Sequence, residues 1–260
     1  MTHMFIFGLG YTGKRIAEAL RADGWQVDAT GSAGNIDFAD RSAVDAALAD
    51  ASHVLSSVPP ADGSDPVLDQ YGAALEGRWL GYLSSTGVYG DAGGAWVDEG
   101  SPIGGGRRTA RSRCDARWLE AGARVFRLPG IYGPDRSAFE RVESGKAHRI
   151  EMPGQVFSRV HVDDIVSGVI AGLDAPGGAY NLSDDLPTSQ NAVIEEACRL
   201  LGRAPPPLVT MDQADLSPMA RGFYAENRRV ANGKAKRVLG WRPQYPDYRA
   251  GLRAIVEERR

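Results

Sequence analysis

Apolar and amphipathic segments alternate along the first half of the chain. An apolar run at 4–7 ends in glycines, and Ile16 and Leu20 then recur at the i, i+4 spacing of a helix that stops near Gly24. The alternation continues with strands predicted at 25–30, 53–58, 79–84 and 124–128 and helices at 43–48 and 113–120. This order predicts an α/β fold built on a Rossmann-type doubly wound parallel sheet.

The pattern becomes less regular after about residue 134. Helices are predicted at 163–173, 191–201 and 234–239, and three consecutive prolines at 205–207 indicate a rigid loop. We expect a single domain over residues 1–260, with the core sheet within about 1–160. A small C-terminal substrate lobe is expected mainly from about 135–155 and 185–260.

A glycine-rich turn follows the first predicted strand and reads Gly-Leu-Gly-Tyr-Thr-Gly. In such a turn Gly8 permits the tight bend, Gly10 lets the backbone approach a pyrophosphate, and Gly13 lets the following helix pack on the strand. The first N–H groups of that helix, from Tyr11 and Thr12 onward, favour phosphate charge. The turn therefore predicts a bound NADP or NAD.

The end of the second predicted strand bears on the choice between these cofactors. NAD-binding folds ordinarily place an acidic residue about 20 residues after the glycines, where it bonds the ribose 2′-hydroxyl. This chain has Thr30, Gly31 and Ser32 there, and Ser32 can donate to a 2′-phosphate, so NADP is slightly favoured. The alternative is NAD, with Asp28 or Asp37 serving the adenosine end.

Four further stretches carry motifs. They read Ser-Ser-Thr-Gly-Val-Tyr-Gly at 84–90, Arg-Leu-Pro-Gly-Ile-Tyr-Gly-Pro at 127–134, Arg-Val-His-Val-Asp-Asp-Ile at 159–165 and Leu-Gly-Trp at 239–241. Together with the glycine turn, they resemble the extended short-chain dehydrogenase/reductase family, the NAD-dependent epimerase/dehydratase group. The resemblance follows the family's order and implies an oxidoreductase or epimerase that transfers hydride to or from a nucleotide sugar or a similar small polar metabolite.

The resemblance also assigns site residues. Ser85 matches the hydroxyl that bonds the reacting oxygen of the substrate, and Ser57 and Pro59 match positions beside the nicotinamide. Where the family has Tyr-x-x-x-Lys, this chain has Thr109 and Arg113, as in an atypical branch. Arg113 can hold the ribose and supply positive charge, but the aliphatic hydroxyl of Thr109 is a far weaker acid than a phenol.

Two tyrosines are candidates to replace the missing phenol. Tyr89 and Tyr132 each follow a strand that leads toward the cofactor in the family, and for each the alternative is a packed aromatic. The missing phenol also supports a different class of function, a catalytically quiet NAD(P)-binding sensor or regulatory protein.

Three arginines, at positions 159, 228 and 229, are candidates to bind a substrate phosphate or carboxylate, and for at least two of them a solvated surface position is the alternative. By the family resemblance, His161, Asp163 and Asp164 begin a helix in a structural role.

Composition narrows the class of partner. The net charge is −3 and the arginines are scattered, so we expect no nucleic acid. The two cysteines and four histidines lack ligand spacing, so we expect no metal and a reducing compartment. The early first strand and the lack of an apolar run of about 18 residues favour a cytoplasmic protein without membrane contact. The expected partner is a small-molecule substrate, and the expected state is a monomer or homodimer.

Overall fold

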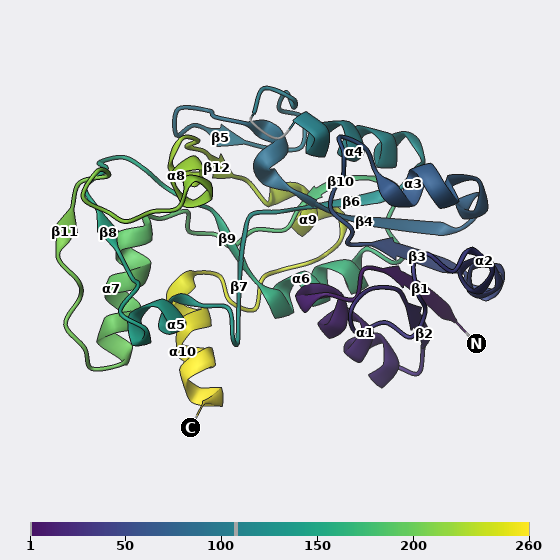
Figure 1. Ribbon diagram of the computed structural model, residues 1–260, viewed down its shortest axis with the longest axis horizontal. Coiled ribbons are helices and arrows are strands. Elements are labelled where there is room, and N and C mark those ends of the chain that lie inside the picture. The colour runs from purple at the N-terminus through teal and green to yellow at the C-terminus, as the bar shows by residue number, and fades with distance from the viewer. Residues whose placement is uncertain (1, 107–108, 260) are drawn as a thin grey trace.

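Six parallel strands form the central sheet of the protein (Figure 1). The computed structural model describes residues 2–106 and 109–259. The strands are β1 (His3–Phe7), β2 (Gln26–Ala29), β3 (His53–Ser56), β4 (Trp79–Ser85), β6 (Arg124–Leu128) and β10 (Gly178–Asn181). Their spatial order is β10-β6-β4-β3-β1-β2. The chain therefore adds β2 on one side of β1 and then crosses over to add β3 and the later strands on the other side. The predicted α/β fold with a doubly wound parallel sheet is confirmed.

Helices cover both faces of this sheet. One face packs against α1 (Tyr11–Ala22) and α6 (Val162–Ala171), and the other against α2 (Arg41–Asp50), α3 (Pro66–Tyr71) and α4 (Thr109–Glu120). Because successive side chains of a strand point to opposite faces, a strand covered on both sides is apolar throughout.

Strand β1 shows this double burial. Met4 and Ile6 join the core under α1 and α6, whereas Phe5 and Phe7 join the core under the other helices, and all four are fully buried. The uninterrupted apolar run at 4–7 is therefore the sequence signal of a central strand.

The sheet extends beyond residue 160, where the sequence predicted its end. Strand β10 pairs with β6 in parallel, from Gly178 opposite Arg124 to Asn181 opposite Arg127. The predicted boundary of the sheet at residue 160 was therefore too early. The strand beyond it, β10, has four residues and follows an irregular segment, so the sequence did not indicate it.

The second half of the chain also builds a separate apolar core. Phe139 of α5 (Ala138–Glu143), Ile194 of α7 (Gln190–Leu200) and Leu252 of α10 (Tyr248–Glu258) meet there. Figure 1 shows these helices on the opposite side of the molecule from α1 and α2. The remaining elements are η1 (Gly72–Leu75), η2 (Thr86–Tyr89), β5 (Trp96–Val97), β7 (Gly130–Tyr132), β8 (Arg149–Ile150), β9 (Arg159–His161), β11 (Leu208–Val209), α8 (Pro218–Tyr224), β12 (Arg229–Val230) and α9 (Gly233–Val238).

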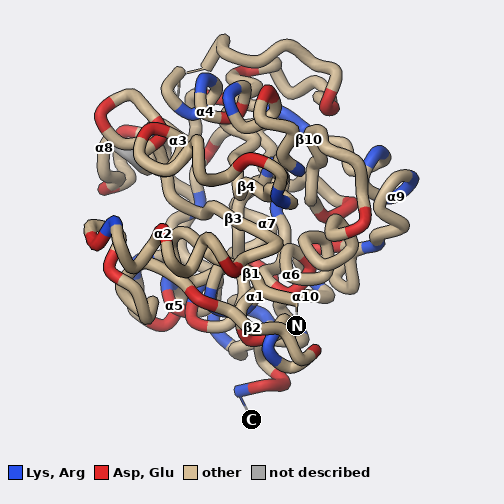
Figure 2. Tube along the Cα trace, turned by 90° about the vertical axis from the view of Figure 1, so that its right-hand side faces the viewer, with Lys and Arg blue, Asp and Glu red and all other residues tan. Residues whose placement is uncertain are grey.

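Charged residues of both signs are interspersed over the trace (Figure 2), as the mild net charge indicates. Among the helices of the described residues, none is long and apolar enough to cross a bilayer.

A buried ion pair links the sheet to α4. The side chains of Arg127 on β6 and Asp115 on α4 are 3% and 0% exposed. Their two hydrogen bonds are 2.6 and 3.1 Å long, and Ser84 of β4 donates to the same carboxylate at 2.6 Å. Arg127 also donates to the hydroxyl of Tyr89, which donates in turn to Asn181 on β10. The three neighbouring sheet strands β4, β6 and β10 thus contribute to one polar network.

A second buried carboxylate attaches the C-terminal segment to α6. Asp164 accepts hydrogen bonds from the backbone N–H of Gln244 at 2.5 Å and of Tyr245 at 3.2 Å. The indole of Trp241 donates to the backbone carbonyl of Asp164. Burial raises the pKa of Asp164 to about 6.

Removing the acid of the buried pair should destabilise the fold strongly. Asp115→Ala leaves Arg127 buried without its counter-charge, so the free energy of unfolding should fall by about 3–5 kcal/mol. Denaturant titration measures this change. The matched control is Asp45→Ala, which breaks an exposed pair with Arg41 and should cost under about 1 kcal/mol. Equal losses in the two variants would contradict a structural role for the buried pair.

The buried acid on α6 should give stability that is lost as pH rises. The pKa of Asp164 is about 6 in the folded protein and about 3.9 when unfolded, so its contribution is complete below about pH 4 and lost on passing pH 6. Relative to Asp164→Asn, the wild type should therefore be more stable at about pH 4.5 than at about pH 7.5. Denaturant titration at both pH values checks this.

A carboxyl group whose pKa is shifted in the opposite direction provides the control. The backbone N–H of Ala43 lowers the pKa of Asp40, the N-cap of α2. The advantage of the wild type over Asp40→Asn should therefore shrink as pH falls. If the stability difference from the wild type changed with pH in the same direction for both variants, the opposite pKa shifts of Asp164 and Asp40 would be contradicted.

Candidate functional site

The glycine turn is held tightly against the ends of β2 and β3. Gly8 has φ +89°, a left-handed conformation that favours glycine. Its N–H donates to Thr30 Oγ1 at 3.2 Å, and its carbonyl accepts from Ser57 Oγ at 2.5 Å. A Cβ on Gly13 would lie 2.8 Å from the carbonyl oxygen of Gly8, so only glycine lets α1 approach this closely.

The start of α1 is left open beside that turn. Gly10 is the N-cap, it is exposed, no side chain caps the helix, and a Cβ there would meet no atom within 4 Å. The first N–H groups of a helix have no intrahelical acceptor, and their partial positive charge attracts anions. The residues present therefore fit the pyrophosphate of a nicotinamide dinucleotide.

A hollow of about 360 Å³ lies at the end of β2. It is lined by Gly31, Gly34, Asn35, Ile36, Asp37 and Phe38. A Cβ on Gly31 would be 2.7 Å from the N of Leu9, so the hollow adjoins the glycine turn. Ser32 is exposed and does not line it, and Asp28 is held by the Asn35 amide at 2.7 Å. Of the acids considered from sequence, Asp37 is the one at the hollow.

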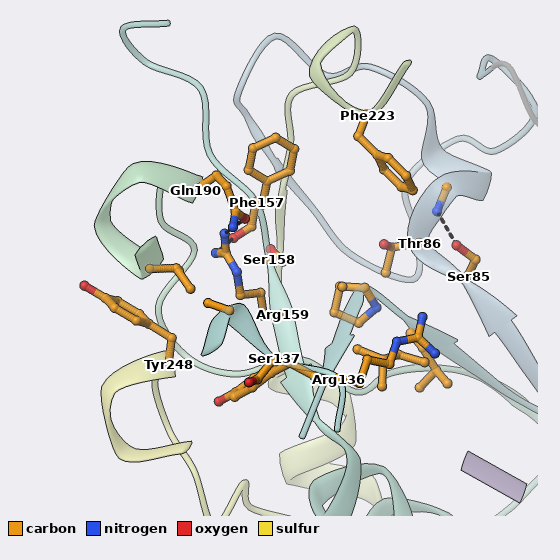
Figure 3. A pocket seen from close by; sticks show the side chains of 18 of the residues that line it. Ser85, Thr86, Arg136, Ser137, Phe157, Ser158, Arg159, Gln190, Phe223 and Tyr248 are labelled. Atoms are coloured by element: carbon orange, nitrogen blue, oxygen red, sulfur yellow. Dashed lines mark hydrogen bonds between the residues drawn. The ribbon is translucent and has the colours of Figure 1, made fainter. Parts of the chain in front are cut away.

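A larger cleft of about 1030 Å³ lies between the carboxyl ends of the strands and the helices of the second core (Figure 3). The sequence-predicted residues that line it are Gly10, Tyr11, Thr12, Gly13, Ser57, Ser85, Tyr132, Arg159 and Arg228. Pro59 is exposed and does not line it.

Ser85 ends β4 at the wall of this cleft. Its Oγ accepts a hydrogen bond from the N–H of Gly87 at 3.1 Å, drawn in Figure 3. Because the hydroxyl acts there as an acceptor, its own proton remains available for a ligand oxygen. Thr86 lies beside it and also lines the cleft.

Of the two α4 arginines Arg111 and Arg113, Arg111 is the one that lines the cleft. Thr109 is exposed, and Arg113 turns away to the carbonyl of Gly63, where it donates an exposed hydrogen bond of 3.2 Å. Neither lines the cleft, whereas Arg111 does, and it donates to Tyr82 at 3.0 Å. Side chains two residues apart on a helix point about 200° apart. Motif spacing alone therefore could not show which of the two arginines faces the cleft.

Neither candidate tyrosine presents a free phenol to the cleft. The hydroxyl of Tyr89 is buried and donates to Asn181 Oδ1 at 2.8 Å. The hydroxyl of Tyr132 is buried against Gly251 of α10. Burial raises the pKa of both groups. These positions correct the hypothesis that one of them replaces the missing proton donor, because both are packed aromatics.

Tyr11 is also engaged, since its hydroxyl donates to the carbonyl of Pro134 at 2.8 Å. Its ring lies under Arg136, a cleft residue that no sequence motif indicated.

The His-Val-Asp-Asp motif is structural, as its position at a helix start suggested. His161 is buried and caps α6 by accepting from the N–H of Asp163 at 3.3 Å. Burial lowers the pKa of His161 to about 4, so the ring is neutral at pH 7. The Asp163 carboxylate pairs with Arg15 at 2.9 Å.

The three candidate arginines lie in different surroundings. Arg159 is buried and lines the cleft. Arg228 lines it too, and it donates to Glu226 and to the carbonyl of Gly90. Arg229 donates to the carbonyl of Gly94 and does not line the cleft.

No model of a known protein family matches the chain. Among curated proteins, YeeZ of Escherichia coli is 28% identical over 95% of this chain and 97% of its own length. A 3-diazoavenalumate denitrifying reductase of Streptomyces is 33% identical, but the match covers 49% of this chain and 45% of the reductase. The chain thus matches less than half of that enzyme's length.

Solved structures give broader matches. A conserved protein of unknown function from Silicibacter pomeroyi is 39% identical over 99% of both chains, with a TM-score of 0.88. A dTDP-glucose 4,6-dehydratase from Bacillus anthracis, solved with NAD, gives 0.79 at 17% identity over 99% and 96% of the two chains. A human epimerase family protein, solved with NADPH, gives 0.78 at 17% identity over 98% and 99%. The chain therefore belongs to the family of the Silicibacter pomeroyi protein, and its fold is that of the NAD-dependent epimerase/dehydratase type of extended short-chain dehydrogenase/reductase.

Proposed function

We propose that the protein binds NADP or NAD and catalyses oxidoreduction or epimerisation of a small molecule by hydride transfer. The observation that carries the proposal is that the open start of α1 and the Ser85 hydroxyl line one cleft. Neighbours of the same fold are solved with NAD or NADPH, which supports the cofactor class. A nucleotide sugar or a similar polar metabolite is the substrate class that the family resemblance suggests.

The side chains have separate roles in this proposal. Gly10 and the first N–H groups of α1 would hold the pyrophosphate, and the bound nicotinamide would accept or deliver the hydride. Ser85 would donate its hydroxyl proton in a hydrogen bond to the reacting oxygen and so stabilise charge that develops there. Arg111 would supply positive charge in the cleft, the role that the sequence assigned to Arg113.

The end of β2 supports a slight preference for NADP. No acidic side chain follows the strand directly, and Ser32 is exposed and able to donate to a 2′-phosphate. Asp37 at the neighbouring hollow is the feature that would favour NAD.

A second function is a catalytically quiet NAD(P)-binding sensor. The positions of Tyr11, Tyr89 and Tyr132 favour it, because these hydroxyls are committed to or buried within the protein and none replaces the missing phenol. Such a protein would bind the cofactor without turning it over.

Cofactor binding should be weakened by an acid at the N-cap of α1. Gly10→Asp places a side chain in open space, and aspartate is a good N-cap, so the fold should be preserved or stabilised. Its carboxylate would repel the pyrophosphate and weaken binding at least about tenfold. Fluorescence titration with NADPH and with NADH measures the dissociation constants and their ratio.

The control for this variant is Gly72→Ala, at a helical glycine with equally open surroundings outside the cleft. It should bind as the wild type does. Unchanged NADPH binding by folded Gly10→Asp would rule out the pyrophosphate assignment, and tighter binding of NADH than NADPH by the wild type would reverse the cofactor preference.

An enzyme should transfer isotope where a sensor should not. With 4-deuterated NADPH and a panel of small carbonyl compounds and nucleotide sugars, the wild type should transfer deuterium stereospecifically. Ser85→Ala should lower that rate by about 10²-fold or more. Arg111→Ala should also lower it, whereas Arg113→Ala should not, because Arg113 lies outside the cleft. Cofactor binding without any isotope transfer across the panel would favour the sensor.

A further inference from the structure

The cleft carries a set of apolar side chains on its walls, beside exposed charged residues such as Arg136, Arg141 and Lys146. Its walls include Leu128, Ile131, Phe157, Val193, Phe223 and Leu252. Figure 3 shows Phe157 and Phe223 on opposite sides of one space, with Ser85 and Thr86 beyond Phe223. Sugar hydroxyls buried against such walls would lose hydrogen bonds to water without replacement. These walls therefore fit a ligand with an apolar body.

One buried cation lies beside these apolar side chains. Arg159 is 7% exposed and lines the cleft. Its guanidinium donates to the carbonyls of Phe157 at 2.8 Å and Thr188 at 3.1 Å, and to Gln190 Oε1 at 3.0 Å. All three acceptors are neutral, and in the described part of the chain no carboxylate lies within ion-pair distance of this group.

The contrast with Arg127 is informative. Arg127 is buried to a similar degree and has a bidentate carboxylate partner within the fold. A buried charge without such a partner costs free energy. An anion from outside the protein that pairs with the charge would offset this cost. Asp184 is near enough to interact electrostatically with Arg159, but its two carboxylate oxygens make no hydrogen bond with the described residues, so it does not pair with the guanidinium as Asp115 does with Arg127.

The free donors of Arg159 suit a flat anion. Its three hydrogen bonds come from Nη1 and Nη2, and Nε–H makes none with the described residues. Nε–H and Nη2 lie on the same edge of the guanidinium, the geometry that binds a carboxylate in bidentate form. The guanidinium also lies 5.9 Å from the centre of the Phe157 ring, which meets Tyr224 edge to face at 5.4 Å.

We infer that the substrate is a small organic acid with a flat apolar or aromatic body, whose carboxylate is received by Arg159 and whose body lies between Phe157 and Phe223. This inference rests on the proposed function and narrows its substrate class away from nucleotide sugars.

Binding of trans-cinnamate to the full chain, measured by calorimetry, tests the inference, with neutral cinnamamide as the matched ligand. Cinnamate should bind at least about tenfold more tightly, because only the acid can pair with Arg159. Arg159→Met should remove that difference. Arg229→Gln should preserve it, because Arg229 does not line the cleft.

A second variant covers the case in which Arg159→Met does not fold. Phe223 is 49% exposed, so Phe223→Ala should fold and should weaken cinnamate binding by about threefold or more through lost apolar contact. Equal binding of acid and amide by the wild type would overturn the inference. Tighter binding of phenyl phosphate or of UDP-glucose than of cinnamate would also overturn it.

NADPH binding measured on the same samples separates this inference from the proposed function. NADPH binding without cinnamate binding overturns the carboxylate site and preserves the cofactor proposal. Cinnamate binding without NADPH binding overturns the cofactor proposal and preserves the carboxylate site.

Discussion

The pair formed by Arg127 and Asp115 is the interaction on which the arrangement of the site depends. It is the most deeply buried ion pair described, and it joins a strand of the sheet to the helix that carries Arg111. Ser84, the neighbour of Ser85, donates to the same carboxylate. The position of the cleft-lining end of β4 is thus tied to the electrostatics of the core rather than to the surface loops around it.

The same network extends to the second half of the molecule. Tyr89 connects Arg127 to Asn181, and the Asn181 side chain donates to the carbonyl of Ala231, in the segment just after β12. A chain of hydrogen bonds in a low-dielectric interior is mutually strengthening but tolerates no missing member. A tyrosine that seemed a candidate for proton transfer is therefore better understood as a connector between the sheet and the opposite wall of the cleft.

Local chemistry made much of the cofactor side of the cleft predictable. Glycine suits the positive φ of Gly8 and the 2.8 Å approach at Gly13. Because these local requirements select glycine, they can be recognised in the sequence. The direction of Arg111 depends on how α4 is rotated against the sheet, which motif spacing does not encode. Likewise, Arg127 and Arg159 are both strand arginines with similar burial, and only tertiary contacts show that one has an internal counter-ion. The edge strand β10 was missed because its four residues, Gly-Ala-Tyr-Asn, do not form an apolar run like that of β1.

The way the glycine turn is fixed has a kinetic consequence. Ser57, Thr30 and the start of α1 hold its backbone from three sides before any ligand arrives. A turn that is already ordered loses little conformational entropy on binding, so more of the contact energy appears as affinity. Its association rate is then set by diffusion and orientation rather than by a loop that must first rearrange. On this side of the cleft the backbone is fixed by contacts within the protein itself.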